Sequence, residues 1–332
     1  MFFCLFTCSK PDAQAKSVTS KTYHRDGSIK SQLVYVNGLK NGRYIEYFNN
    51  GLIKSEGSYI DDKKNGKWIG YYENGVIEYK RSYLNNKATG KWIYYYTDGK
   101  IKQEISYING LKNGKYIRYD KMGKLISIKE YSDNLPNGEW VRYYKNGLVK
   151  NKKIYKNKLA HGEWLAYYSN GNIKYLKKYQ NDKEDGEWVY YYENGAIEKI
   201  ENYKNGEKES KRTMFFHDGK LKIEQNYQYN SENGIYTEYY NSGQIKTRGN
   251  YKIGNKDGEW VSFYLNGQIK EQINYINGVY DGEHTIYYSN GEIKYMGNWK
   301  NGKRNNIFKW YYENGQLIEQ VTYKDGVMDW VY

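Results

Sequence analysis

The chain has 332 residues, a formal net charge of +14 and 39% hydrophobic residues, a low share for a compact globular domain. Its two cysteines, Cys4 and Cys8, exclude a disulfide framework or a cysteine zinc site in the rest of the chain. Tyrosine is the main apolar material, with 43 Tyr and 9 Trp against 8 Phe, and such rings bury large areas with few rotatable bonds.

Residues 1–19 form a short hydrophobic start followed by a tether. The run Leu5-Phe6-Thr7-Cys8 is similar to a lipoprotein lipobox, which makes Cys8 the candidate lipidated residue. The hydrophobic run is too short and lacks the basic start of a full signal peptide, so we expect the true start codon to lie upstream. This predicts a lipoprotein of the cell envelope; the alternative is a cytoplasmic protein whose hydrophobic start has no function. No stretch is long enough for a transmembrane helix.

From residue 20 to residue 332 the chain repeats with a fixed period of 24 residues, and no insertion or deletion interrupts the period. Such a period predicts an array of identical supersecondary units and leaves no room for a separate catalytic domain. We call each set of residues spaced by 24 a column and name it after its member between residues 37 and 60. Column 51 is always glycine: Gly27, Gly51, Gly75, Gly99, Gly123, Gly147, Gly171, Gly195, Gly219, Gly243, Gly267, Gly291 and Gly315.

Two further columns are rich in glycine. From Gly42 to Asn306, column 42 departs from glycine only at Ser210 and Asn306, and column 38 holds glycine, asparagine, aspartate or, once, lysine. These residue types, apart from the lysine, tolerate a positive φ, so we predict that each of the three columns marks a turn.

Short aromatic and β-branched runs lie between these columns. The run Lys67–Tyr72 leads into Asn74-Gly75, and the next run opens with an aliphatic residue of column 53 and closes with an aromatic residue of column 59. Two β-rich runs around Asn-Gly predict a hairpin with a two-residue turn. We therefore predict an all-β fold, an elongated antiparallel β-hairpin repeat array of about 13 repeats over residues 20–332. Ser20 lies in a capping first hairpin, and residues 329–332 are a C-terminal cap strand.

The turn decides which side chains share a face. If Asn50-Gly51 is a two-residue turn, residue 48 lies opposite 53, residue 46 opposite 55 and residue 44 opposite 57, and opposite residues share a face. Columns 44, 48, 53 and 59 then form an aromatic face that we expect to be buried or to stack. Columns 43, 45, 47 and 54 form a solvated face, on which the rings of column 47 cover the lysine stems of column 54. A turn of another length changes this pairing.

Two sets of side chains are the candidates for binding. The aromatic set contains Trp68, Trp92, Trp140, Trp164, Trp188, Trp260, Tyr72, Tyr96, Tyr144 and Tyr168. The basic set is a stripe in column 54 that contains Lys54, Lys102, Lys150, Lys174, Lys222, Lys246 and Lys270. Such a stripe attracts anionic lipid, nucleic acid or an acidic protein, whereas the alternative is a solvated face that prevents aggregation. We expect no nucleic-acid binding, because no recognition module is present.

The sequence offers no constellation for catalysis. Its histidines lie in different parts of the chain: His24, His161, His217 and His284. No Ser-His-Asp set, metal-ligand spacing or phosphate loop can be assembled from these residues. We therefore expect no enzyme activity, no cofactor, no metal and no small-molecule substrate.

The repeated pattern Tyr-x-Asn-Gly-x-x-Asn-Gly-x-Trp-x-x-Tyr-Tyr-x-Asn-Gly-x-Ile-Lys resembles the MORN repeat and is most similar to the bacterial variant in YwqK-family antitoxins. Residues 107–116 carry the pattern well, and the resemblance covers about residues 20–327. It implies a stack of hairpins in a single sheet with an aromatic groove, and roles in lipid binding, protein scaffolding or dimerisation. Choline- or glucan-binding cell-wall repeats are similar too, but they contain Gly-Trp, which this chain lacks.

Three functions are consistent with these observations. The first is a non-catalytic protein-binding scaffold or adaptor that uses an extended aromatic and basic surface. The second is an antitoxin-like protein that neutralises a toxin by covering it. The third is a module that binds anionic membrane or cell wall. Breaks in the pattern, such as Arg212 and His284 in column 44 and Asp120 in column 48, are either binding centres or products of repeat decay.

Overall fold

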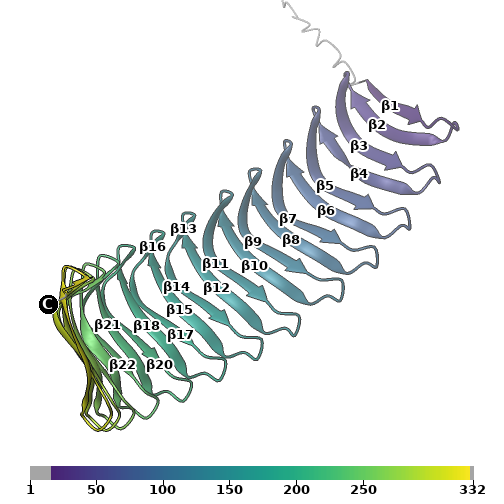
Figure 1. The fold of residues 1–332 in the computed structure, drawn as a ribbon. Coiled ribbons are helices and arrows are strands. Elements are labelled where there is room, and N and C mark those ends of the chain that lie inside the picture. Colours follow the sequence, from purple (N-terminus) through teal and green to yellow (C-terminus); the bar gives the residue numbers. More distant parts are fainter. Residues whose placement is uncertain (1–15, 330–332) are drawn as a thin grey trace, which may run out of the picture. The chain divides into compact units, whose positions relative to one another are not determined.

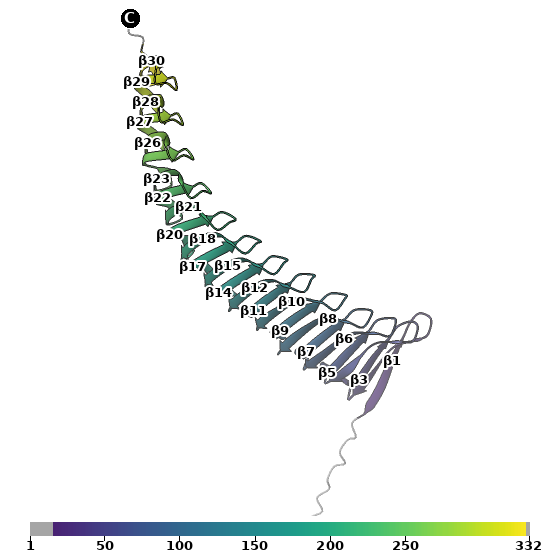
Figure 2. The same ribbon diagram turned by 90° about the horizontal axis from the view of Figure 1, so that it is seen from below.

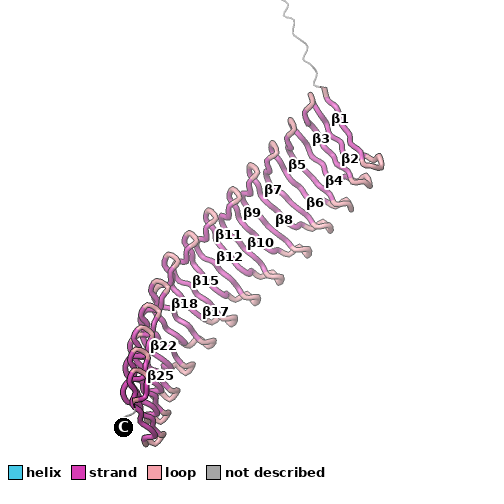
Figure 3. Tube along the Cα trace, turned by 45° about the horizontal axis from the view of Figure 1, so that its top comes forward, coloured by secondary structure: helices cyan, strands magenta, loops and turns pink. Residues whose placement is uncertain are grey.

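The structure is a computed structural model that describes residues 16–329 of the chain. This part contains 31 strands and no helix, which confirms the predicted all-β hairpin array (Figure 3). No helix that could cross a bilayer therefore occurs between residues 16 and 329. The predicted lipidation site at Cys8 and the last three residues of the predicted cap strand lie outside the described residues.

The chain divides into two compact units, residues 1–147 with 155–158 and residues 148–154 with 159–332. In the first unit each strand pairs antiparallel with its neighbours in the chain, as a single layer (Figure 1). Its strands are β1 (Ser17–Tyr23), β2 (Ile29–Val36), β3 (Leu39–Tyr47), β4 (Ile53–Ile60), β5 (Lys63–Tyr71), β6 (Ile77–Leu84), β7 (Lys87–Tyr95), β8 (Ile101–Ile108), β9 (Leu111–Tyr119), β10 (Leu125–Ser132) and β11 (Leu135–Tyr143). The next strand, β12 (Val149–Lys156), is divided between the units.

The second unit repeats the same antiparallel meander (Figure 2). In four of its hairpins the strand that follows the column 38 turn is split into a short and a longer piece. The strands are β13 (Leu159–Ala160), β14 (Gly162–Tyr167), β15 (Ile173–Gln180), β16 (Lys183–Glu184), β17 (Gly186–Tyr191), β18 (Ile197–Lys204), β19 (Glu207–Lys208), β20 (Ser210–Phe215), β21 (Leu221–Gln228), β22 (Ser231–Tyr239), β23 (Ile245–Lys252), β24 (Asn255–Lys256), β25 (Gly258–Phe263), β26 (Ile269–Ile276), β27 (Val279–Tyr287), β28 (Ile293–Lys300), β29 (Lys303–Tyr311), β30 (Leu317–Lys324) and β31 (Val327–Met328).

The turn at column 51 is longer than the predicted two residues. The Phe48 N–H donates to the Leu52 carbonyl at 2.8 Å, and the Gly51 N–H donates to the Phe48 carbonyl at 3.0 Å. Gly51 has a φ of +80°, so the loop has three residues and ends in a glycine bulge. The Asn50 side chain accepts a hydrogen bond from the Leu52 N–H at 3.0 Å, which explains why asparagine precedes this glycine.

The two-residue turn lies instead at column 38. Asn37 and Gly38 have φ values of 49° and 85°, the pair of positive angles that a type I′ hairpin turn requires. Column 42, the third column predicted as a turn, lies within a strand. Gly42 has a φ of +127° and sits where the pairing of β2 with β3 shifts by a bulge. The prediction is therefore right for columns 51 and 38 and wrong for column 42.

The pairing register separates two faces of the sheet. Glu46 lies opposite Ser55 and Tyr44 opposite Gly57, as predicted, but Ile53 lies opposite Tyr47 rather than residue 48 because of the longer turn. We call the side that carries columns 40, 44, 46, 55, 57 and 59 face A, and the side that carries columns 43, 45, 47, 56 and 58 face B. Among the described residues, every buried side chain belongs to face A except three valines of column 45, which are Val141, Val189 and Val261.

A valine at a column 51 glycine is expected to destabilise one hairpin. Gly147 has a φ of +90°, and no atom other than its chain neighbours lies within 4 Å of the position that a Cβ would take. The left-handed backbone costs an L-residue about 1–2 kcal/mol, and a branched side chain resists it most. We expect Gly147→Val to lower the free energy of unfolding in urea by this amount and Gly147→Asn to lower it less. Equal losses in both variants would contradict the turn assignment.

Candidate functional site

The rings of column 44 form a ladder with the tyrosines of column 59 on face A. The Trp188 ring lies 5.3 Å from Tyr179 and 4.5 Å from Tyr203, measured between ring centroids. Trp92 lies 5.1 Å from Tyr83 and 4.6 Å from Tyr107 in the same way. Each tryptophan therefore joins the hairpin before it to the hairpin after it. The structure thus brings the predicted tryptophans together with the closing tyrosines of the repeats.

The tryptophans also hold the strand bulges. The indole Nε1 of Trp92 donates to the Ser82 carbonyl at 2.9 Å, and that of Trp188 donates to the Lys178 carbonyl at 2.9 Å. The same bond, to the residue ten positions earlier, is made by Trp140, Trp164 and Trp260. Only 4% of Trp68, 5% of Trp188 and 4% of Trp260 is exposed. Most of the surface of these three predicted binding residues is therefore buried by packing between hairpins.

The residue in column 57 decides how its neighbouring ring is covered. Where it is glycine, the ring lies flat on the backbone: a Cβ added at Gly57 or Gly249 would stand 2.2 Å from the Trp68 or Trp260 ring. Where column 57 is lysine, its own ammonium group lies over the tryptophan as a cation–π contact. The three such distances from Nζ to ring centroid are 4.3 Å for Lys129 and Trp140, 4.2 Å for Lys153 and Trp164, and 4.3 Å for Lys177 and Trp188.

The predicted tyrosines of column 48 form a second, separate ladder. Their hydroxyl groups donate to a backbone carbonyl at the next column 51 turn, so they tie successive turns together. The distances are 2.7 Å from Tyr72 to Tyr95, 2.9 Å from Tyr96 to Tyr119 and 2.8 Å from Tyr168 to Tyr191. Tyr144 occupies the same column. The predicted aromatic set is thus divided between the ring ladder of face A and the turn edge.

The predicted basic stripe runs along the same turn edge. Lys54 and Lys246 form ion pairs with Glu46 and Glu238 of face A, at 2.8 and 2.9 Å. Four other lysines lie over column 48 rings rather than the column 47 rings that the sequence indicated: Lys102 over Tyr96, Lys174 over Tyr168, Lys222 over Phe216 and Lys270 over Tyr264. Lys150 belongs to the same column. Glu78 and Glu198 replace the lysine at two positions of this column.

Among the residues that the structure describes, the most deeply buried carboxylate is one that sequence reasoning missed. Glu201 is 3% exposed and accepts hydrogen bonds from Lys199 Nζ at 2.9 Å and Lys208 Nζ at 2.8 Å. Burial raises the pKa of the Glu201 carboxyl, but the bonds from Lys208 and Lys199 oppose it, and the net pKa lies below its usual range. The signal in the sequence was a single acidic residue in column 57.

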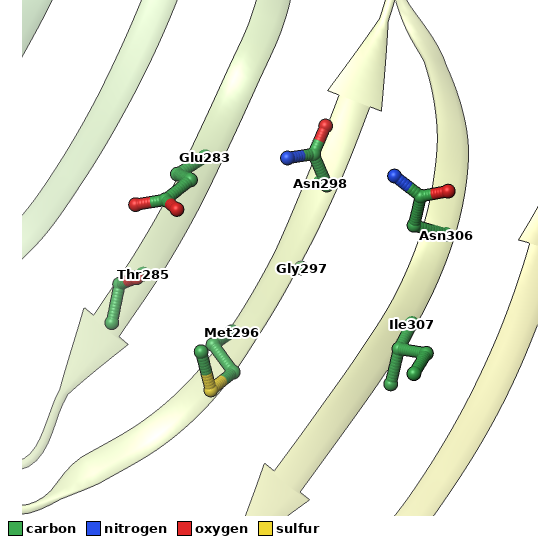
Figure 4. Close-up of a pocket in the computed structure, with 7 residues that line it drawn as sticks. All are labelled: Glu283, Thr285, Met296, Gly297, Asn298, Asn306 and Ile307. Atoms are coloured by element: carbon green, nitrogen blue, oxygen red, sulfur yellow. The ribbon is translucent and has the colours of Figure 1, made fainter.

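Shallow hollows open on face B. One, of about 220 Å³, lies across β27, β28 and β29 (Figure 4) and is lined by Glu283, Thr285, Met296, Gly297, Asn298, Asn306 and Ile307. Another, of about 310 Å³, has both basic and apolar lining residues and includes Lys67, Ile69, Lys80, Ser82, Lys91 and Ile93. No group of three histidine, cysteine or acidic side chains placed to hold a metal ion occurs within residues 16–329.

Comparison with protein families identifies the repeats. The family model described as MORN repeat variant matches twelve segments of the chain: residues 17–37, 40–61, 64–85, 88–109, 136–157, 160–181, 184–205, 208–229, 232–252, 256–277, 280–301 and 304–325. The unmatched segment 110–135 contains Asp120 in column 48, yet it folds into β9 and β10 like its neighbours.

No curated protein matches the chain. Among solved structures, the crystal structure of TcdB2-TccC3 is 12% identical, with a TM-score of 0.19, over 92% of this chain and 21% of that chain. The crystal structure of TcdB2-TccC3 without its hypervariable C-terminal region is also 12% identical, with a TM-score of 0.18, over 92% of this chain and 20% of that chain. The chain spans about a fifth of the length of these structures.

Replacing Gly57 by alanine is expected to expel the Trp68 ring. The backbone of Gly57 is not left-handed, so the cost arises from the 2.2 Å approach of the new Cβ to the ring. We expect the free energy of unfolding to fall by about 1–3 kcal/mol, the usual cost of overpacking. The tryptophan emission should shift to the red as Trp68 meets water. Ser58→Ala, on face B of the same strand, is the control and should change neither measurement.

The Glu201 cluster predicts a pH-dependent contribution to stability. Because the folded pKa of Glu201 is lowered, its stabilisation is complete above the unfolded value near 4.5 and is lost as pH falls through the folded value. We expect Glu201→Gln to lower the free energy of unfolding at pH 7 by about 1.5–3 kcal/mol, the range for hydrogen bonds to charged groups. The difference from the wild type should shrink below pH 4.5. A difference independent of pH in urea titrations would contradict this account, and exposed Glu187→Gln is the control.

Proposed function

The chain belongs to the MORN repeat variant family, and on that premise we propose that it acts as a non-catalytic scaffold that binds a partner protein through face A. Its hairpins supply a constant framework. Column 53 is aliphatic and column 47 is tyrosine or phenylalanine in every repeat. Arrays of this kind bind partners along an extended surface, because each repeat adds area beside the last.

The observation that carries this proposal is the variety of the central columns of face A. Columns 46, 55 and 57 change size and charge from one hairpin to the next, while their framework stays constant. Column 46 alone holds Thr22, Glu46, Gly70, Tyr94, Arg118, Arg142, Ala166, Tyr190, Met214, Glu238, Ser262, Ile286 and Trp310. A regular sheet does not need such variety for its own packing. A surface that recognises one irregular partner does need it.

One part of face A indicates the charge of the partner. Arg118 and Arg142 are exposed and lie on either side of Ser127, which pairs with both of them. Lys129 lies beside them: burial lowers the pKa of its ammonium group, and the nearby Arg142, Arg118 and Lys112 lower it further. No ion-pair partner for these four cations occurs among the described residues. An acidic surface on the partner would supply the missing negative charge.

Two matched variants test this proposal. Arg118→Glu with Arg142→Glu reverses two charges on face A, and Lys67→Glu with Lys115→Glu makes the same change in net charge on face B. We expect capture from a lysate of the source organism, followed by quantitative mass spectrometry, to recover one protein with the wild type and with the face B variant. The face A variant should lose it. Recovery of the same protein by all three would refute the role of face A.

The basic stripe supports a second candidate, binding to anionic membranes. Its lysines lie at one edge of each hairpin, where a membrane surface could approach them. Two of the seven are already neutralised by Glu46 and Glu238, which weakens this candidate. Sedimentation with liposomes separates the two functions. Binding that rises with the content of phosphatidylserine would favour the membrane, and binding that is absent or independent of it would favour the protein partner.

Narrower versions of the proposal concern the kind of partner and its location. A toxin is one partner that face A could cover, as the resemblance to YwqK-family antitoxins suggests, and rescue of growth on co-expression with a neighbouring toxic gene would support it. Attachment to the cell envelope through Cys8 is a separate proposal. Loss of detergent-phase partitioning in Cys8→Ser would support it, and unchanged partitioning would oppose it.

A further inference from the structure

Three hairpins place two aromatic rings directly opposite each other across columns 55 and 46 of face A. These pairs are Tyr79 with Tyr94, Tyr175 with Tyr190, and Tyr295 with Trp310. Their ring centroids are 6.4, 6.3 and 5.6 Å apart, with interplanar angles of 52°, 57° and 59°. The geometry is therefore nearly the same each time, and such tilted rings present their faces to a cation placed between them.

In two of the three pairs the chain supplies that cation itself, from column 57. The Arg81 guanidinium carbon lies 3.8 Å from the Tyr79 centroid and 5.1 Å from that of Tyr94. Lys177 Nζ lies 4.8 Å from Tyr175 and 5.1 Å from Tyr190. In each of the first two pairs, a cationic side chain of this chain therefore lies over both rings.

The third pair has no such cation, because column 57 is Gly297 in this hairpin, and the Phe308 ring packs on that glycine with its centroid 5.9 Å from that of Tyr295 and 6.3 Å from that of Trp310. Arg304 is a nearby cation, but it lies over Trp299, Phe308 and Tyr323. No lysine or arginine of the described residues lies over Tyr295 or Trp310. Both rings are half-buried, so part of each remains open to solvent.

The residue beside the third pair also differs, because it alone is acidic. The residue opposite the second ring is Gln103 in the first pair and Lys199 in the second, and Lys199 Nζ itself lies 4.2 Å from the Tyr190 centroid. The corresponding residue in the third pair is Glu319, which lies opposite Trp310. Glu319 is exposed and has no ion-pair partner among the described residues. The pair that lacks an internal cation is therefore the pair with an adjacent free carboxylate.

We infer that Tyr295, Trp310 and Glu319 form a clamp for a cationic side chain, arginine or lysine, of the partner protein. The inference rests on the proposed function and adds a specific contact to it. The two rings attract the cation through their faces, and the carboxylate of Glu319 neutralises its charge. The partner surface that it implies is mixed, with an acidic region for Arg118 and Arg142 and a basic residue for this clamp.

A titration with small probes tests the clamp without knowledge of the partner. The full chain is labelled with 5-fluorotryptophan, and the Trp310 signal is followed by fluorine NMR as N-acetyl-arginine amide or N-acetyl-lysine amide is added. N-acetyl-citrulline amide, a neutral isostere of the arginine probe, is the control. We expect a saturable shift with the cationic probes and none with citrulline. A larger response to one cationic probe identifies the preferred side chain. No response to either probe, or an equal response to citrulline, would overturn the inference.

A second variant keeps the test independent of folding defects. Glu319→Lys should place an internal cation beside Trp310, as Lys199 does beside Tyr190, and should weaken the probe response at least about tenfold. Glu313→Lys makes the same charge change at an exposed turn position and should leave the response intact. An unchanged response in Glu319→Lys would overturn the inference. These outcomes are separate from the proposed function, because capture through Arg118 and Arg142 uses the other compact unit.

Discussion

The hairpins of a single-layer sheet have no second layer to cover them, so neighbouring hairpins must bury one another. The tryptophans of column 44 do this on face A, as Trp188 does between Tyr179 and Tyr203, and the other features of the sheet follow from their position. The glycine bulge of column 42 leaves a carbonyl within reach of the indole N–H. Column 57 then sets whether the ring rests on a glycine or under a lysine of that column. With this face as the main site of burial, low overall hydrophobicity is compatible with a folded chain.

Much of the fold could be predicted because the turn and strand pattern, which is a weak signal in a single copy, recurs in every repeat. Thirteen copies of the column 51 glycine, eight of them preceded by asparagine, fixed the hairpins and the pairs of residue 44 with 57 and 46 with 55. The turn type could not be predicted, because Asn-Gly suits both a two-residue turn and the end of a three-residue loop. The extra residue moved column 48 to the turn edge. Column 42 was misread for a related reason, since a positive φ serves a strand bulge as well as a turn.

The candidate site was predicted only in part, because its properties depend on neighbours across the strands. The sequence located the tryptophans, but their burial depends on a column 57 residue about eleven positions away, and that contact requires the register. The same holds for Glu201, whose partner Lys199 lies two residues earlier on β18 while its partner Lys208 lies on the neighbouring strand β19. Column 46 was not singled out as a site at all. The structure places it in the centre of face A.

The even period of the array has a consequence for how such a surface can change over generations. Inserting or removing one whole repeat returns every later residue to the same column, and therefore to the same face. A duplication of 24 residues lengthens face A and keeps every later side chain on its original face. A single inserted residue would instead move the later side chains to the opposite face. The residues of columns 46, 55 and 57 can then diverge one hairpin at a time, while the columns that form the framework stay constant. A lineage can in this way remodel what it binds while inheriting how it folds.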